Sequence, residues 1–91
     1  MIVSFKHKGL EELYKARKSK KIDQKMQKRI LRRLDALDAA TKPEDMNIPG
    51  FDFHGLQGHV PKCYSVHING PWCVTFEWDD GARNVNYEQY H

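Results

Sequence analysis

The residues best suited to chemistry in this sequence are histidines, four of which lie in the second half of the chain at positions 54, 59, 67 and 91. Imidazole titrates near neutral pH, so it can act as a general base or a general acid. Metal-free cleavage of RNA needs one group that takes the ribose 2′-hydroxyl proton, one that returns a proton to the leaving oxygen, and a cation near the phosphate. The candidates for these catalytic parts are His54, Lys62, Tyr90 and His91. Folding must bring them together, because a histidine taken alone is more often an ordinary surface residue.

Two other arrangements of reactive side chains carry a weaker signal. His54, Cys63, His67 and Cys73 can be drawn as a zinc site, but no C-x-x-C or H-x-x-x-H spacing is present. Cys73 and His67 can be drawn as a nucleophile and its base. No orienting acid is visible, however, and two polar neighbours on one face are the commoner case. There is no P-loop and no G-x-G-x-x-G motif. The sequence predicts no metal and no cofactor.

Positive charge is concentrated in one segment. Ten of the fifteen Lys and Arg residues lie between positions 14 and 33, where Asp23 is the only acid, so this segment carries +9 and the rest of the chain −6. A solvated helix surface explains such a segment about as well as a site for a polyanion or an acidic partner.

The first half of the chain predicts two amphipathic helices. Residues 2–5 are typical of a short strand, and a helix is expected over residues 10–19. Asp23 is a plausible N-cap for a second helix that runs to about Ala40, and Pro43 ends the helical pattern. The expected apolar stripes are Leu10, Leu13 and Tyr14 in the first helix and Met26, Ile30, Leu34 and Leu37 in the second. The basic residues are expected on the outer faces of the helices.

From residue 51 onward the hydrophobic period changes to two. Segments 51–54, 63–68, 72–78 and 84–88 alternate apolar and polar side chains, and residues 79–81 form a tight turn. The fold class is therefore α+β, with two N-terminal helices packed on one face of an antiparallel β-sheet. The polar face is left open. Side-chain parity predicts that Ile68 lies opposite Trp72 and that His67 lies opposite Cys73.

Size and composition set further limits. Ninety-one residues are expected to form one domain, residues 1–91. Two cysteines are too few for a disulfide framework, so we expect free thiols and a cytoplasmic location. No signal peptide and no apolar run long enough to span a membrane is visible.

Several stretches together resemble a known family. The opening MIVSFKHKGLEELY, the RRLDALDAAT of the second helix, FHGLQG, YSVHINGPWCVTFEWDDG and the closing NYEQYH are similar to the HigB-type toxins of the RelE/ParE superfamily. The resemblance covers nearly the whole chain. It implies the toxic half of a type II toxin–antitoxin pair, neutralised by a small helix-turn-helix antitoxin. Many family members cleave mRNA in the ribosomal A site without a metal.

The resemblance also implies an active site. The family's terminal Tyr-His pair corresponds to Tyr90 and His91, and His54 matches the histidine of the family's H-P-L-K-G motif. The last two side chains are therefore expected near His54, over the uncovered face of the sheet. Three positions that are usually basic in the family are Gln57, Asn69 and Cys73 here. We hypothesise that the additional basic residues His59, Lys62 and His67 compensate for them.

The function expected from this resemblance is ribosome-dependent cleavage of mRNA, which inhibits translation. His54 and His91 would act as acid and base, Tyr90 would position the phosphate or base, and operator DNA would be bound only through the antitoxin. The residues expected to bind nucleic acid are Lys15, Arg17, Lys18, Lys20, Lys21, Lys25 and His67. Two alternatives remain open at this point: a gyrase-binding toxin, and an inactive toxin that retains only antitoxin and operator functions.

Overall fold

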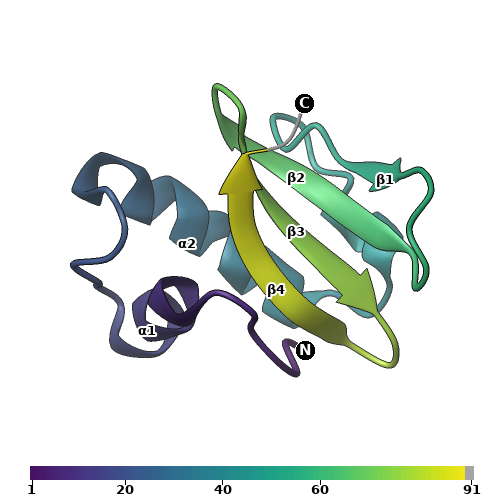
Figure 1. Cartoon of the computed structure of the whole chain (residues 1–91), viewed down its shortest axis with the longest axis horizontal. Helices are drawn as coiled ribbons and strands as arrows, with labels where there is room; N and C mark the ends of the chain where they lie inside the picture. Colours follow the sequence, from purple (N-terminus) through teal and green to yellow (C-terminus); the bar gives the residue numbers. More distant parts are fainter. Residues whose placement is uncertain (90–91) are drawn as a thin grey trace.

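The computed structural model describes residues 1–89 as two helices followed by a four-stranded sheet (Figure 1). The predicted α+β fold class is confirmed. The sheet is antiparallel with strand order β1-β2-β3-β4, and the helices cover one of its faces. The elements are α1 Lys8–Ala16, α2 Gln24–Ala39, the 3-10 helix η1 Pro43–Met46, β1 His54–Leu56, β2 Cys63–Asn69, β3 Trp72–Trp78 and β4 Ala82–Gln89.

Local capping residues determine where the two helices begin. Helix α1 begins two residues earlier than predicted, because Nδ1 of His7 accepts a hydrogen bond from the Leu10 amide over 3.0 Å. It ends at Ala16, short of the predicted residue 19, because Arg17 adopts a left-handed conformation with φ 66°. The predicted cap of α2 is confirmed, since the Asp23 carboxylate accepts from the Lys25 amide over 3.0 Å.

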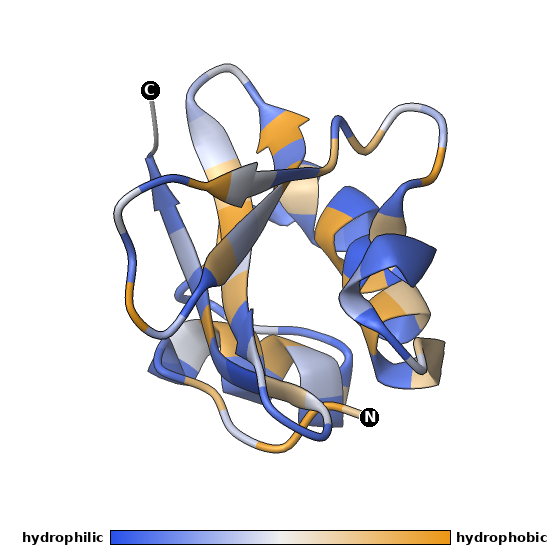
Figure 2. Ribbon diagram, turned by 90° about the vertical axis from the view of Figure 1, so that its right-hand side faces the viewer, coloured by the Kyte–Doolittle hydropathy of each residue, from blue (hydrophilic) through white to orange (hydrophobic). Residues whose placement is uncertain are grey.

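The core forms between the helices and the covered face of the sheet. Leu13 of α1, Ile30 and Leu34 of α2, and Val66 and Phe76 of the strands are at most 1% exposed. Figure 2 shows hydrophobic segments alternating with hydrophilic ones along these elements, as expected when each has one buried face. One expectation was wrong: Arg33 does not lie on the outer face of α2 and is only 7% exposed.

The N-terminal segment runs beside β4. The predicted strand over residues 2–5 is reduced to two isolated parallel bridges, which join Ile2 to Ala82 and Phe5 to Val85. The amide of Ile2 also donates to the Asp38 carboxylate over 2.9 Å, which ties the segment to the end of α2. These contacts cover part of the outer edge of β4.

The register of the sheet is interrupted near the end of β2. His67 lies opposite Cys73 as predicted, but the expected pairing of Ile68 with Trp72 was wrong. Asn69 lies opposite Trp72 instead, and the register shifts between His67 and Asn69 because the connection between the strands has only two residues, 70 and 71.

The segment directly before β1 is not part of a strand. Residues 51–53 precede the strand that was predicted to include them, since Asp52 has φ 48° and β1 begins at His54.

None of the helices within residues 1–89 has the length and apolar character needed to cross a membrane.

Candidate active site

The open face of the sheet carries a cavity of about 630 Å³. Its walls come from the segment before β1, from β1 and β2, and from the beginning of β3. The lining residues are Asp52, His54, Gly55, Leu56, Gln57, Ser65, His67, Gly70 and Cys73. Two of the histidines singled out in the sequence, His54 and His67, therefore line the same cavity.

Both ring nitrogens of His54 have a hydrogen-bond partner. Nδ1 lies 2.9 Å from the carbonyl oxygen of Asp52, which can only accept, so Nδ1 is assigned the proton. Nε2 lies 3.3 Å from Oγ of Ser65, the residue directly opposite on β2. In the neutral ring Nε2 then carries the lone pair and can take up a proton, while the Ser65 hydroxyl orients this edge of the ring.

The ring of His67 has the opposite tautomer. Its Nε2 lies 2.9 Å from the carbonyl oxygen of Gly70, so Nε2 carries the proton and Nδ1 the lone pair in the neutral form. The main chain of His67 is also held in place. Its amide donates to the Phe51 carbonyl over 2.6 Å, and its carbonyl accepts from Nε of Arg33 over 3.1 Å.

Cys73 lies in the cavity wall as a protonated thiol. Burial raises the pKa of Cys73, and the carboxylates of Asp52 and Glu88 raise it further. Its Sγ lies 3.9 Å from the carbonyl oxygen of Pro71, to which the thiol donates. The thiol is thus the neutral form near pH 7, which argues against Cys73 as a nucleophile paired with His67.

A second hollow of about 430 Å³ lies on the same face. Within it the Glu88 carboxylate accepts hydrogen bonds from the Thr75 hydroxyl and, over 3.2 Å, from the Asn86 amide. Sequence reasoning missed this network, although Thr75, Asn86 and Glu88 all occupy polar positions of the alternating pattern. The hollow is lined by Lys6, His59, Cys63, Thr75, Phe76, Glu77, Asn84, Asn86 and Glu88.

The side chain of Lys62 does not lie beside His54. Its Nζ lies 5.5 Å from the centre of the Tyr64 ring, which stacks on Phe76 on the covered face of the sheet. Lys62 passes across Gly55, where an added Cβ would lie 3.0 Å from the lysine Cε. The lysine therefore reaches the side opposite the one on which His54 meets Ser65.

The predicted catalytic residues Tyr90 and His91 lie outside the described residues. The strand that precedes them, β4, ends at Gln89, which lies opposite Trp72. Its neighbour Glu88 lies opposite Cys73, a residue of the cavity wall. Strand β4 therefore ends beside the strand that carries Cys73.

Comparison with protein families decides the assignment. The family model described as RelE-like toxin of the type II toxin-antitoxin system HigB matches residues 3–91. The chain belongs to the HigB-like toxin family. The resemblance predicted from its sequence motifs is confirmed, and membership implies a toxin with a cognate antitoxin as its partner.

Two curated relatives of this HigB-like toxin span its whole length. "Endoribonuclease HigB" of Proteus vulgaris is 36% identical over 92 residues, which is 100% of this chain and 100% of the relative. "Toxin HigB-1" of Vibrio cholerae serotype O1 is 32% identical over 93 residues, which is 100% of this chain and 98% of the relative.

The substituted positions of this HigB-like toxin fall at or near the cavity. Gln57 and Cys73 line it, whereas Asn69 lies opposite Trp72 at the end of β2. Among residues 1–89, those that line the cavity include no lysine and no arginine. The side chains of this wall that can become cationic are His54 and His67. No group of three His, Cys, Asp or Glu residues in the described part of the chain could hold a metal ion.

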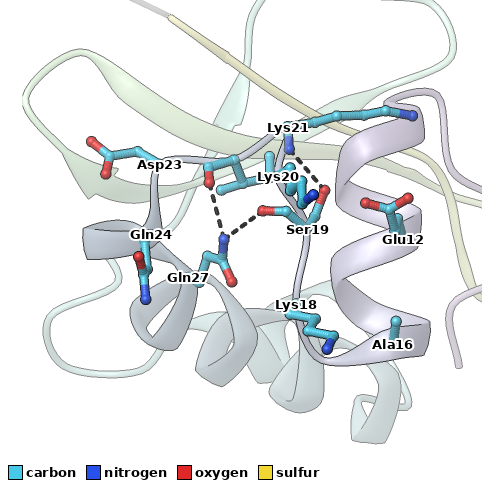
Figure 3. A pocket seen from close by; sticks show the side chains of 10 residues that line it. Glu12, Ala16, Lys18, Ser19, Lys20, Lys21, Asp23, Gln24 and Gln27 are labelled. Carbon is cyan, nitrogen blue, oxygen red and sulfur yellow. Dashed lines mark hydrogen bonds between the residues drawn. The ribbon is translucent and has the colours of Figure 1, made fainter.

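Three lysines of the HigB-like toxin lie at the turn between α1 and α2 (Figure 3). The amide of Gln27 donates to the carbonyl oxygens of Ser19 over 2.6 Å and Ile22 over 3.0 Å, which fixes the path of the turn. A hollow of about 960 Å³ lies beside it. Three exposed lysines that were predicted to bind nucleic acid line the hollow: Lys18, Lys20 and Lys21.

Two other residues predicted to bind nucleic acid already have acidic partners. Lys15 pairs with Glu11 over 2.9 Å, one turn earlier in α1. Arg17 pairs with Asp35 of α2 over 2.9 Å. Both pairs are exposed, so they hold these side chains only weakly. Lys25 is exposed in the first turn of α2.

Proposed function

We propose that this HigB-like toxin is a ribosome-dependent endoribonuclease that cuts mRNA without a metal and so inhibits translation. The observation that carries the proposal is the His54 ring, whose Nδ1 is held by the Asp52 carbonyl and whose Nε2 carries the lone pair beside the Ser65 hydroxyl in a cavity. The relative from Proteus vulgaris, which is 36% identical over its full length, is named an endoribonuclease.

In this proposal two imidazoles carry out the reaction. His54 Nε2 takes the proton from a ribose 2′-hydroxyl, whose oxygen attacks the adjacent phosphorus. The bond from phosphorus to the 5′-oxygen breaks, and a second imidazolium protonates that oxygen. We assign this acid role to His91, and to Tyr90 the positioning of the phosphate or base, because the family resemblance implies that both belong to the active site. The products are a 2′,3′-cyclic phosphate and a 5′-hydroxyl.

Charge on the phosphate must be stabilised by an unusual set of groups. A positioned donor or cation is typically worth a factor of about 10²–10³ in rate. Because Lys62 lies on the covered side of the sheet, its expected compensating role passes in our proposal to His67, which lines the cavity with His54. His59 lines the neighbouring hollow.

In this proposal the turn between α1 and α2 makes the contact with the ribosome. Lys18, Lys20 and Lys21 are exposed and line the same hollow, which suits a phosphate backbone. The cognate antitoxin is proposed to be a helix-turn-helix protein that carries the toxin to operator DNA. The toxin acts in the cytoplasm, where mRNA is translated.

The test uses the purified toxin, purified ribosomes and one defined mRNA. Cut mRNA with a 2′,3′-cyclic phosphate end is expected with ribosomes present, in the presence or absence of a chelator that leaves the ribosomes intact. If expression of the toxin arrests the growth of cells but the purified assay gives no cut mRNA, the proposal is contradicted and a toxin that acts by binding alone is favoured.

A further inference from the structure

Arg33 is a buried cation whose contacts are made with main-chain oxygens and a ring. Nε donates to the carbonyl oxygen of His67 over 3.1 Å, Nη2 to that of Gly50 over 3.2 Å, and Nη1 to that of Arg29 over 3.3 Å. Cζ lies 4.4 Å from the centre of the Phe51 ring. The side chain is only 7% exposed, and three carbonyl oxygens and one aromatic ring hold it in place.

The position of Arg33 follows from the end of strand pairing. The ladder between β1 and β2 stops at the pair of His54 and Ser65. Beyond it the His67 amide still donates to Phe51, and the His67 carbonyl lies beside an irregularity in the register of β2 and β3. A buried carbonyl without a donor is unfavourable, and Arg33 of α2 supplies that donor.

The segment that Arg33 holds leads directly into the other wall of the cavity. Gly50 and Phe51 precede Asp52, whose carbonyl oxygen accepts a hydrogen bond from Nδ1 of His54. Arg33 thus contacts the main chain of one cavity histidine and the segment that orients the other. The link between Phe51 and His67 closes this set of contacts.

From this arrangement we infer that Arg33 is a positioning residue that sets the placement of His54 and His67 relative to each other, an inference that rests on the proposed function for its link to RNA cleavage. Arginine suits the role because its planar group offers donors in several fixed directions. Lysine offers a single ammonium and cannot reach three separated carbonyls in the same way. A misplacement of about 1 Å at a reacting group can cost about 10²-fold in rate.

The direct test compares Arg33→Lys with Arg32→Lys, a charge-conserving change at the exposed neighbouring residue of the same helix. The ¹⁵N-labelled imidazole signals of both cavity histidines are recorded by NMR. In Arg33→Lys we expect both rings to change their tautomer balance together, while the helix signal in circular dichroism is retained. Arg32→Lys should leave both rings as in the wild type. Unchanged rings in Arg33→Lys, or a change in only one ring, would overturn the inference.

A kinetic measurement separates positioning from binding. The single-turnover rate on ribosome-bound mRNA should fall by about 10–100-fold in Arg33→Lys, with ribosome affinity unchanged. An unchanged rate, or a loss confined to affinity, would overturn the inference. If the wild type does not cut mRNA, the proposed function fails but the imidazole spectra still decide the role of Arg33.

A second variant protects the test against misfolding. Phe51→Leu keeps an apolar side chain but removes the ring that lies against the guanidinium. We expect smaller changes in the same direction at both histidine rings. If Arg33→Lys does not fold and Phe51→Leu folds with both rings unchanged, the inference is wrong.

Discussion

The Nε2 atom of His54 and the Oγ atom of Ser65 lie 3.3 Å apart across the pair of β1 and β2. Because Nδ1 of the same ring donates to the Asp52 carbonyl over 2.9 Å, the imidazole is oriented from both of its nitrogens. An exposed histidine would otherwise sample several ring orientations. The two contacts hold the ring in one orientation, with Nε2 as the atom that can accept a proton.

Removal of the Ser65 hydroxyl should reduce cleavage without loss of fold. In Ser65→Ala the ring keeps its Nδ1 contact but loses the group that orients Nε2, so we expect the single-turnover rate to fall by about 10-fold. Ser4→Ala, which changes a hydroxyl that accepts from the Asn84 amide away from the cavity, serves as the control. Equal rates for Ser65→Ala and the wild type would contradict this role.

Removal of the Lys62 ammonium should have little effect on cleavage. Since Lys62 lies over Tyr64 on the covered side of the sheet, Lys62→Ala should retain the wild-type rate within about 3-fold, as surface changes usually do. The measurement is the same single-turnover assay. A fall of about 100-fold or more would show that the lysine reaches the phosphate in the complex.

The Cys73 thiol should be dispensable for chemistry. Its raised pKa keeps it protonated near neutral pH, so iodoacetamide at pH 7 should leave Cys73 unmodified by mass spectrometry and should not abolish cleavage. Rapid alkylation of Cys73 with complete loss of cleavage in the wild type, and the same loss in Cys73→Ser, would indicate a nucleophile.

The same thiol should couple stability to alkaline pH. A pKa raised in the folded state contributes stability below the pKa of the unfolded thiol, and that contribution is lost as the pH rises. The urea midpoint of the wild type should therefore fall more between pH 7 and about pH 10.5 than that of Cys73→Ser. Parallel curves for the two proteins would show that burial does not perturb this thiol.

The lysines of the α1–α2 turn should control the salt dependence of ribosome binding. Replacement of Lys18, Lys20 and Lys21 by alanine should make the plot of log association constant against log salt concentration less steep. The slope should decrease in magnitude by roughly one for each phosphate that the variant no longer neutralises. Removal of the same number of charges elsewhere, by alanine at Lys28, Arg32 and Lys42, is the matched control. Similar slopes in both triple variants would mean that net charge alone determines binding.

Much of the fold could be predicted because local and periodic signals agreed. Asp23 capped α2 as expected, and the alternation in residues 72–78 placed a strand correctly. The predicted pairing of Ile68 with Trp72 was wrong, because the argument that opposed residues share a face of the sheet assumes a ladder without irregularities. The two-residue connection instead shifts the register between His67 and Asn69.

The candidate site was predicted in part, because residue types indicate chemistry but not direction. His54 and His67 were recognised as candidates and line one cavity. Lys62 was placed with them by charge, although the space above Gly55 lets it pass to the other face. Arg33 was expected on the outer face of α2, because a basic run on a helix gives no sign of the His67 carbonyl to which Arg33 donates.

The most direct test of the central claim is the rate at which His54→Ala cuts a defined mRNA on purified ribosomes, compared with the wild type. If His54 is the proton acceptor, the single-turnover rate should fall by about 10²–10⁴-fold while ribosome affinity stays the same. Cleavage by His54→Ala at the wild-type rate would contradict the account.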